Sequence, residues 1–271
     1  MSCRRTTPEA RSRAAAAPPA DAGRAAVIVL RSLVFNALFY LVLAAYLVVA
    51  IPTLLMPRRC ILALARQWAR VDLAMLRIIC GITVDWRGRD RIPPGAILVA
   101  VKHQSTWETF ALLTLFPDPT FILKRELLWL PFYGWYARHA GMIPVERGGG
   151  KPALMAMAAL ARAALAAGRQ IVVFPEGTRR PPGAEPRYKY GIAHLYAECG
   201  VPCVPIALDS GLFWARRRFM RYPGTIAVEV LDPIAPGLAV DDFFARLQRE
   251  IETATARLIK EAGGLADRTA S

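Results

Sequence analysis

Acidic residues are scarce in this sequence of 271 residues. It contains 21 Asp and Glu against 35 Lys and Arg, which leaves a formal net charge of +14. Such an excess of positive charge indicates an anionic partner, either a polyanion or an anionic membrane surface. Hydrophobic residues make up 55% of the chain, and this share excludes a largely disordered protein.

Cysteine is also rare, and two common kinds of catalytic site are missing. The five cysteines are odd in number and irregularly spaced, which argues against a disulfide framework and favours a reducing compartment. No Gly-x-Ser-x-Gly elbow of a serine hydrolase occurs. The spacing of His194, Cys199 and Cys203 fits no strong zinc pattern, so we predict no metal site.

Charge is absent from one long stretch, between Arg31 and Arg58. Because about 20 apolar residues cross a bilayer core, this stretch predicts a membrane helix, either a single span or a half-inserted one. Six Arg against two acidic residues in 1–31 give +4, and eight Arg against three Asp in 57–91 give +5. More than half of the charge excess therefore flanks the apolar stretch, which favours a membrane over nucleic acid as the partner.

A second helix is predicted directly after the apolar stretch. Four arginines recur there at the spacing of one helical face: Arg59, Arg66, Arg70 and Arg77. A basic amphipathic helix of this kind is expected in the headgroup region. We therefore expect a disordered leader at 1–25, membrane-anchoring helices at 26–80 and a folded domain at 81–271. The Lys and Arg bias places the folded domain on the cytoplasmic side of the cytoplasmic membrane.

From residue 82, short apolar runs alternate with helical patterns. The predicted strands are 82–86, 96–102, 120–123, 142–145, 171–174, 203–208 and 225–231, and the predicted helices are 107–115, 130–139, 151–167, 191–199 and 240–260. This alternation predicts an α/β fold with a largely parallel central sheet flanked by helices. In such sheets functional sites gather at the carboxyl ends of the strands.

His103 and Glu108 follow the strand at 96–102. A spacing of five does not place two residues on one helical face, so the pair can meet only if the chain turns between them. A carboxylate bonded to one imidazole nitrogen would fix the tautomer and leave the other nitrogen as a base. A purely structural His–acid contact fits the same two residues.

Basic residues follow other predicted strands. Lys124 ends the third strand, Glu146-Arg147-Gly148 follows the fourth, and Pro175-Glu176-Gly177-Thr178-Arg179 follows the fifth. Because Arg offers a planar fork for phosphate, the sequence predicts an anion site at one edge of the sheet. Four further arginines lie among aromatic residues: Arg216, Arg217, Arg218 and Arg221. They predict a solvated or membrane-facing patch that contacts headgroups or an acyl carrier.

Together these motifs resemble the membrane-associated 1-acylglycerol-3-phosphate acyltransferases, the lysophosphatidate acyltransferases, over roughly 80–215. The resemblance rests on four blocks: His103 with Glu108, Glu146-Arg147-Gly148, the intact Phe-Pro-Glu-Gly-Thr-Arg motif from Phe174 to Arg179, and the Val204-Pro205-Ile206 strand. The family usually has Asp where this chain has Glu108, whereas related lipid A acyltransferases commonly have Glu.

The resemblance implies transfer of a fatty acyl group from an acyl thioester to the sn-2 hydroxyl of lysophosphatidate, giving phosphatidate in phospholipid biosynthesis. It implies these roles: His103 as general base, Glu108 as its orienting acid, Arg147, Arg179 and Lys124 as phosphate ligands, and Glu176, Gly177 and Thr178 as organisers of the loop, Glu176 by pairing with an Arg. It implies no cofactor and no metal. It implies acyl-CoA or acyl-carrier protein as the co-substrate. The partners that it implies are the membrane, lysophosphatidate and the acyl thioester. Three alternatives stay open: glycerol 3-phosphate as acceptor, lyso-ornithine lipid as acceptor, or a non-catalytic lipid-binding membrane protein.

Overall fold

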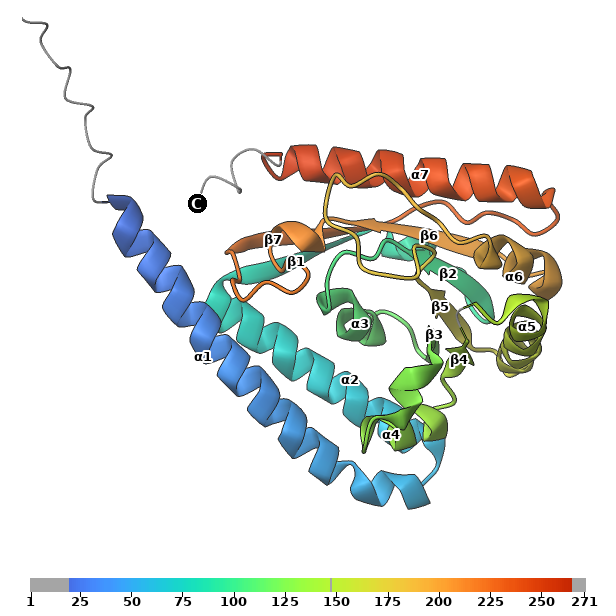
Figure 1. The fold of residues 1–271 in the computed structure, drawn as a ribbon, viewed down its shortest axis with the longest axis horizontal. Helices are drawn as coiled ribbons and strands as arrows, with labels where there is room; N and C mark the ends of the chain where they lie inside the picture. The colour runs from blue at the N-terminus through green and yellow to red at the C-terminus, as the bar shows by residue number, and fades with distance from the viewer. Residues whose placement is uncertain (1–19, 147, 265–271) are drawn as a thin grey trace, which may run out of the picture.

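One seven-stranded sheet organises the chain (Figure 1), in the order β1-β7-β6-β2-β5-β3-β4. The computed structural model describes residues 20–146 and 148–264. The strands are β1 (Ile82–Arg87), β2 (Ile97–Val101), β3 (Pro119–Lys124), β4 (Ile143–Val145), β5 (Gln170–Val173), β6 (Cys203–Leu208) and β7 (Gly224–Val230). The helices are α1 (Ala20–Val49), α2 (Arg58–Met75), α3 (Trp107–Ala111), α4 (Tyr133–His139), α5 (Gly150–Ala166), α6 (Gly191–Cys199) and α7 (Val240–Glu261).

The sheet is mostly parallel, which confirms the predicted fold class. β6, β2, β5, β3 and β4 all run in one direction. β7 pairs antiparallel with β6, and β1 runs parallel to β7, so this edge pair points the other way. The segment between β6 and β7 contains only a short 3-10 turn, Ser210–Leu212, and no crossover helix. A parallel neighbour needs such a crossover, and for this reason β7 returns in the opposite direction.

Strand β2 is buried on both faces and lies in the middle of the layers. Its alternate residues Ile97, Val99 and Val101 belong to the core beneath α1, α2 and α3. Leu98 and Ala100 belong to the core beneath α5, α6 and α7. Figure 1 shows α7 on one side of the sheet and α1 to α3 on the other. The uninterrupted apolar run of β2 is what a central parallel strand requires.

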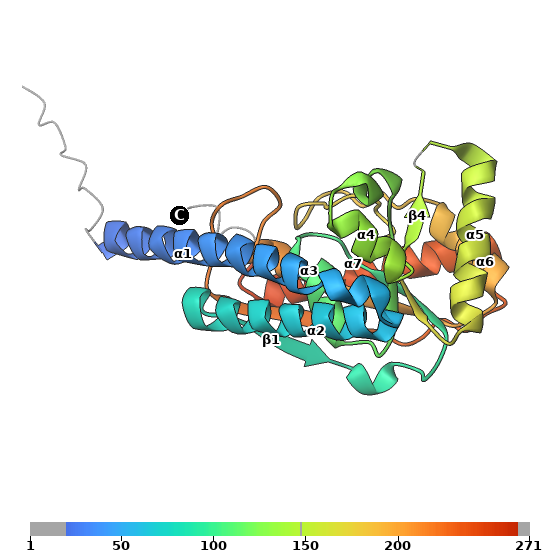
Figure 2. The same ribbon diagram turned by 90° about the horizontal axis from the view of Figure 1, so that it is seen from below.

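Helices α1 and α2 lie side by side, and α1 projects beyond the sheet at its N-terminal end (Figure 2). The segment Gly23–Leu55 is long and apolar enough to cross a membrane. The helix begins at Ala20, so residues 20–25 belong to α1 and not to the expected leader. Alanine, the strongest helix former, is frequent there. The rest of that leader lies outside the described residues.

One face of α1 is fixed to the folded domain. The Phe35 and Phe39 rings pack against Trp214, with centroids 5.5 and 5.7 Å apart. The Arg221 backbone N–H donates to Ser32 Oγ at 2.9 Å, and Arg221 Nη2 donates to Asn36 Oδ1 at 2.9 Å. Ser32 and Asn36, two polar residues of the apolar run, therefore contact the domain.

The predicted second helix is α2 followed by a π-helical turn, Leu76–Cys80, which Gly81 ends with φ 67°. Its basic face is divided. Arg59, Arg70 and Arg77 are exposed, as a headgroup-facing side requires. Arg66 instead donates to the backbone carbonyls of Leu113 at 3.0 Å and Pro117 at 2.8 Å, which joins α2 to the domain. The role of α2 as an anchor stays a prediction.

Candidate active site

Four neighbouring parallel strands, β6, β2, β5 and β3, end at the same edge of the sheet. His103 follows β2, Glu176 follows β5 and Ser210 follows β6, while Lys124 is the last residue of β3. The topology therefore gathers side chains from distant parts of the sequence where an α/β sheet usually has its site.

Glu108 meets His103 because the chain turns before α3 begins at Trp107. His103 Nδ1 lies 2.9 Å from Glu108 Oε1, which also accepts the backbone N–H groups of Gln104 at 2.7 Å and Ser105 at 2.6 Å. The other oxygen, Oε2, accepts Ser210 Oγ–H at 2.9 Å. Glu108 is fully buried, so four hydrogen bonds hold its carboxylate in one orientation. Since the carboxylate accepts, Nδ1 carries the hydrogen and Nε2 is left as the basic nitrogen.

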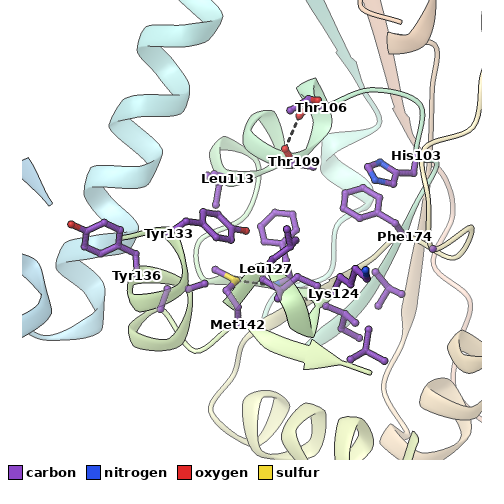
Figure 3. A pocket seen from close by; sticks show the side chains of 18 of the residues that line it. His103, Thr106, Thr109, Leu113, Lys124, Leu127, Tyr133, Tyr136, Met142 and Phe174 are labelled. Atoms are coloured by element: carbon purple, nitrogen blue, oxygen red, sulfur yellow. Dashed lines mark hydrogen bonds between the residues drawn. The ribbon is translucent and has the colours of Figure 1, made fainter. Parts of the chain in front are cut away.

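The His103 ring is fixed from its face as well as from its edge. It stacks on Phe174, with ring centroids 4.0 Å apart and an interplanar angle of 20°. Figure 3 shows the two rings together at one end of a pocket. Nε2 has no hydrogen-bond partner among the described residues, and His103 lines the pocket. This nitrogen is therefore available to a hydroxyl group that enters the pocket.

The pocket has a volume of about 1110 Å³, slightly above the range of about 300–1,000 Å³ usual for ligand sites. Most of its wall is apolar and includes Leu43 and Leu47 of α1. Tyr133 and Tyr136 lie at the end opposite His103 (Figure 3). An aliphatic chain matches this lining.

The predicted phosphate ligands are in different surroundings. Arg179 donates to Oγ1 of Thr106, whose side chain lines the same pocket as His103. Arg179 forms no ion pair with a described residue. Burial lowers the pKa of Arg179. The nearby charge of Glu108 opposes this shift, whereas the charges of Arg216 and Arg217 add to it. Lys124 lines the pocket and forms a half-exposed ion pair with Glu126 at 3.0 Å. Arg147 lies outside the described residues.

Glu176 pairs with Lys102 and not with an arginine, so that expectation was wrong. Its Oε1 accepts Lys102 Nζ at 2.9 Å, and its Oε2 accepts the His103 backbone N–H at 2.9 Å. Arg179 is unavailable to Glu176 because its guanidinium is directed to Thr106. Burial raises the pKa of the Glu176 carboxyl, although the neighbouring Lys102 charge opposes this shift.

The two other predicted loop residues lie at the same turn. Gly177 has φ +63°, a conformation that glycine adopts without strain, and its N–H donates to the Phe174 carbonyl at 2.9 Å. Thr178 is exposed and lines the pocket.

Sequence reasoning missed two residues of this site, Ser210 and Glu252. Ser210 directly follows the β6 end, and the rule that sites gather at strand ends could have indicated it. Glu252 reaches the site from α7, where its Oε1 accepts Lys102 Nζ at 2.6 Å and Tyr188 Oη–H at 2.9 Å. The sequence contains no signal for Glu252, because charged residues on a long amphipathic helix usually face solvent.

Comparisons with known proteins relate the chain to acyltransferases. A family model described as Acyltransferase matches residues 83–209. Residues 83–209 form an acyltransferase domain. The chain is 37% identical over 165 residues to the 1-acyl-sn-glycerol-3-phosphate acyltransferase of Pseudomonas aeruginosa, which covers 61% of this chain and 64% of the relative. It is 33% identical over 184 residues to the human 1-acyl-sn-glycerol-3-phosphate acyltransferase alpha, covering 66% of this chain and 65% of that protein.

The matched part of the chain thus spans less than two thirds of either relative. The fold comparison extends over more of the chain. The crystal structure of the 1-acyl-sn-glycerophosphate acyltransferase PlsC from Thermotoga maritima matches with a TM-score of 0.69 and 20% identity, covering 84% of this chain and 97% of the other. This likeness shows that most of the chain shares a fold with that protein.

Proposed function

We propose that the protein transfers a fatty acyl group from an acyl thioester to the sn-2 hydroxyl of lysophosphatidate, giving phosphatidate. The observation that carries this proposal is His103, whose Nδ1 is bound to buried Glu108 and whose Nε2 is free at the end of an apolar pocket. The relatives named 1-acyl-sn-glycerol-3-phosphate acyltransferase support the choice of acceptor.

In the proposed reaction His103 Nε2 takes the proton of the acceptor hydroxyl as the oxygen attacks the thioester carbonyl carbon. Glu108 stabilises the imidazolium that forms. The tetrahedral intermediate then collapses, the C–S bond breaks, and the imidazolium returns the proton to the leaving thiolate. The products are the new ester and a free thiol, so no acyl-enzyme, metal or redox step is needed. A positioned base of this kind contributes about 10²–10⁴-fold to the rate.

We further propose that α1 anchors the protein in the cytoplasmic membrane with the active site on the cytoplasmic side. Leu43 and Leu47 of α1 line the same pocket as His103, so a chain that leaves the bilayer along α1 reaches the base without crossing water. The cytoplasmic side is where acyl-CoA and acyl-carrier protein, the two candidate donors, are found.

An acceptor panel tests the proposal. The purified full chain is given one labelled acyl thioester and, in turn, lysophosphatidate, glycerol 3-phosphate and lyso-ornithine lipid. We expect lysophosphatidate to be acylated with the highest kcat/KM. Preferential acylation of either other acceptor contradicts the proposed substrate.

The general base is tested by His103→Ala. We expect turnover to fall by about 10²–10⁴-fold, with membrane association and thermal unfolding unchanged. His194→Ala is the matched control, because His194 lies on α6 and does not line the pocket. If His103→Ala keeps full activity, His103 is not the base.

A further inference from the structure

The loop between β6 and β7 brings a second arginine, Arg216, against the segment that carries Arg179. Arg216 Nη1 donates to the backbone carbonyl of Arg179 at 2.8 Å. The next backbone N–H, that of Arg180, donates to the His103 carbonyl at 2.8 Å. Arg216 therefore lies next to the backbone segment that contacts His103, although it is more than 100 residues away in the sequence.

Neither arginine of this pair has a carboxylate of its own among the described residues, although the charge of Glu108 acts on Arg179. No ion pair there includes Arg179 or Arg216, and Arg216 Nε is buried without a hydrogen-bond partner. The nearest relevant carboxylate, Glu108, is already occupied by four donors. The charge of Arg216 acts on that of Arg179, and an anion bound near both would offset their repulsion.

The loop that carries Arg216 is held in place by contacts within the chain. Arg221 Nη1 donates to the carbonyls of Arg218 at 2.8 Å and Phe219 at 2.9 Å, and its guanidinium carbon lies 4.1 Å from the centre of the Trp214 ring. Arg217 has φ +58°, a left-handed conformation that is strained for a residue with a side chain. Strain maintained beside a binding site is common where a loop must be preorganised.

We infer that Arg216 joins Arg179, the phosphate ligand that the family resemblance implies, in binding the phosphomonoester of the acceptor. This rests on the proposed function. The phosphate of lysophosphatidate is attached to the carbon next to the one that bears the reacting hydroxyl, so its site must adjoin His103. A phosphomonoester carries a charge of about −1.5 to −2 near neutral pH, which two guanidinium groups balance, and each group presents a fork suited to phosphate oxygens. The role of Arg216 therefore differs from the membrane-facing patch that its sequence neighbourhood predicts.

The test is Arg216→Ala in the full chain, with Arg218→Ala as the matched control. Arg218 has the same charge, lies in the same loop and is exposed. We expect Arg216→Ala to raise the KM for lysophosphatidate at least about tenfold, equivalent to about 1.4 kcal/mol. We expect its kcat and its KM for the acyl thioester to stay near those of the wild type. Arg216→Lys, which keeps the charge but not the fork, should recover part of the loss.

A neutral acceptor identifies the group that is recognised. For 1-acylglycerol, which lacks the phosphate, Arg216→Ala should have no effect on KM. An equal effect on the neutral acceptor contradicts the proposal. So does an unchanged KM for lysophosphatidate. A rise in the KM for the thioester alone also overturns it, because the anion bound would then be the phosphate of the donor.

A binding measurement separates this inference from the proposed reaction. Inorganic phosphate at constant ionic strength should raise the thermal unfolding midpoint of the wild type and of Arg218→Ala, but not that of Arg216→Ala. This readout needs no turnover, so it holds or fails even if lysophosphatidate is not the substrate. Equal stabilisation of all three proteins, or of none, overturns the anion site.

Discussion

Glu108 and Asp72 are both carboxylates with no exposed surface, and they lie in the same layer of the molecule. Glu108 accepts four hydrogen bonds. Neither oxygen of Asp72 has a hydrogen-bond partner among the described residues, and burial raises the pKa of Asp72 to about 7. Two equally buried carboxylates thus have opposite surroundings: Glu108 is supplied with hydrogen-bond donors, and Asp72 is not.

The difference shows what a buried charge needs. Desolvation disfavours the ionised form of both groups, and only hydrogen-bond donors or opposite charges offset it. The donors to Glu108 come from the turn that carries His103 and from Ser210 in the turn after β6. The cost of burying Glu108 is therefore offset by the segments that build the active site. Asp72 is buried where α2 packs against the rest of the molecule, and no described residue supplies it with a hydrogen-bond donor.

The largest effect is expected from Glu108→Gln, which keeps the shape of the side chain and removes its charge. The amide NH₂ group faces donors that need an acceptor, and the imidazolium loses its counter-charge. We expect kcat to fall by at least about 10²-fold, within the range of general acid–base contributions. Steady-state kinetics of the purified chain measure this, and a variant with more than half of the wild-type kcat contradicts the orienting role.

A smaller loss is expected from Ser210→Ala, which removes one of the four donors. An oxygen of Glu108 then stays buried without a partner, and a hydrogen bond to a charged group contributes about 1.5–3 kcal/mol. We expect a lower free energy of unfolding and a decrease in kcat of about tenfold, since 1.4 kcal/mol corresponds to one factor of ten. The matched control is Thr255→Val, because the Thr255 hydroxyl is equally buried but has no partner among the described residues. Equal losses of stability and activity in both variants contradict the comparison.

The smallest effect on activity is expected from Asp72→Asn, since Asp72 does not line the pocket. Its effect is on stability. The unfolded chain releases the Asp72 proton near pH 3.8, whereas the folded chain keeps it to about pH 7. At this group the folded state therefore binds more protons between these values, and the contribution of Asp72 to wild-type stability decreases as the pH rises from 4 to 7.

Asp72→Asn removes this pH dependence. One pKa unit corresponds to about 1.4 kcal/mol, so we expect the variant to gain a few kcal/mol over the wild type at pH 8 and almost nothing at pH 4. Denaturant unfolding of the full chain in detergent at the two pH values measures the gain. A gain of the same size at both pH values indicates that Asp72 does not titrate as described.

The fold could be predicted from the sequence because its elements have strong local signals. Each of the seven strands lies within one residue of its predicted range, since the apolar runs of a parallel sheet are bounded by polar turns. The reversed direction of β7 was missed, because strand direction depends on how a connection packs and not on local pattern. His103 and Glu108 were found because they share one turn.

Long-range partners could not be predicted. Ser210 contacts Glu108 and Arg216 contacts Arg179 across large sequence separations, so no spacing rule relates them. Arg216 lies among other arginines, and composition alone made the whole group look like a surface patch. The burial of Asp72 had a weak signal, since it lies one helical turn after Trp68, on the side of α2 that packs into the core.

The contacts of Ser32 and Asn36 with Arg221 have a practical consequence for anyone who shortens this chain to obtain a water-soluble fragment. Cutting away α1 removes the hydroxyl and the amide that bind Arg221, and it uncovers Trp214 where Phe35 and Phe39 pack. The loop that presents Arg216 loses its support at the same time. A truncated fragment that is inactive therefore reports damage to the β6–β7 loop as well as the loss of the bilayer.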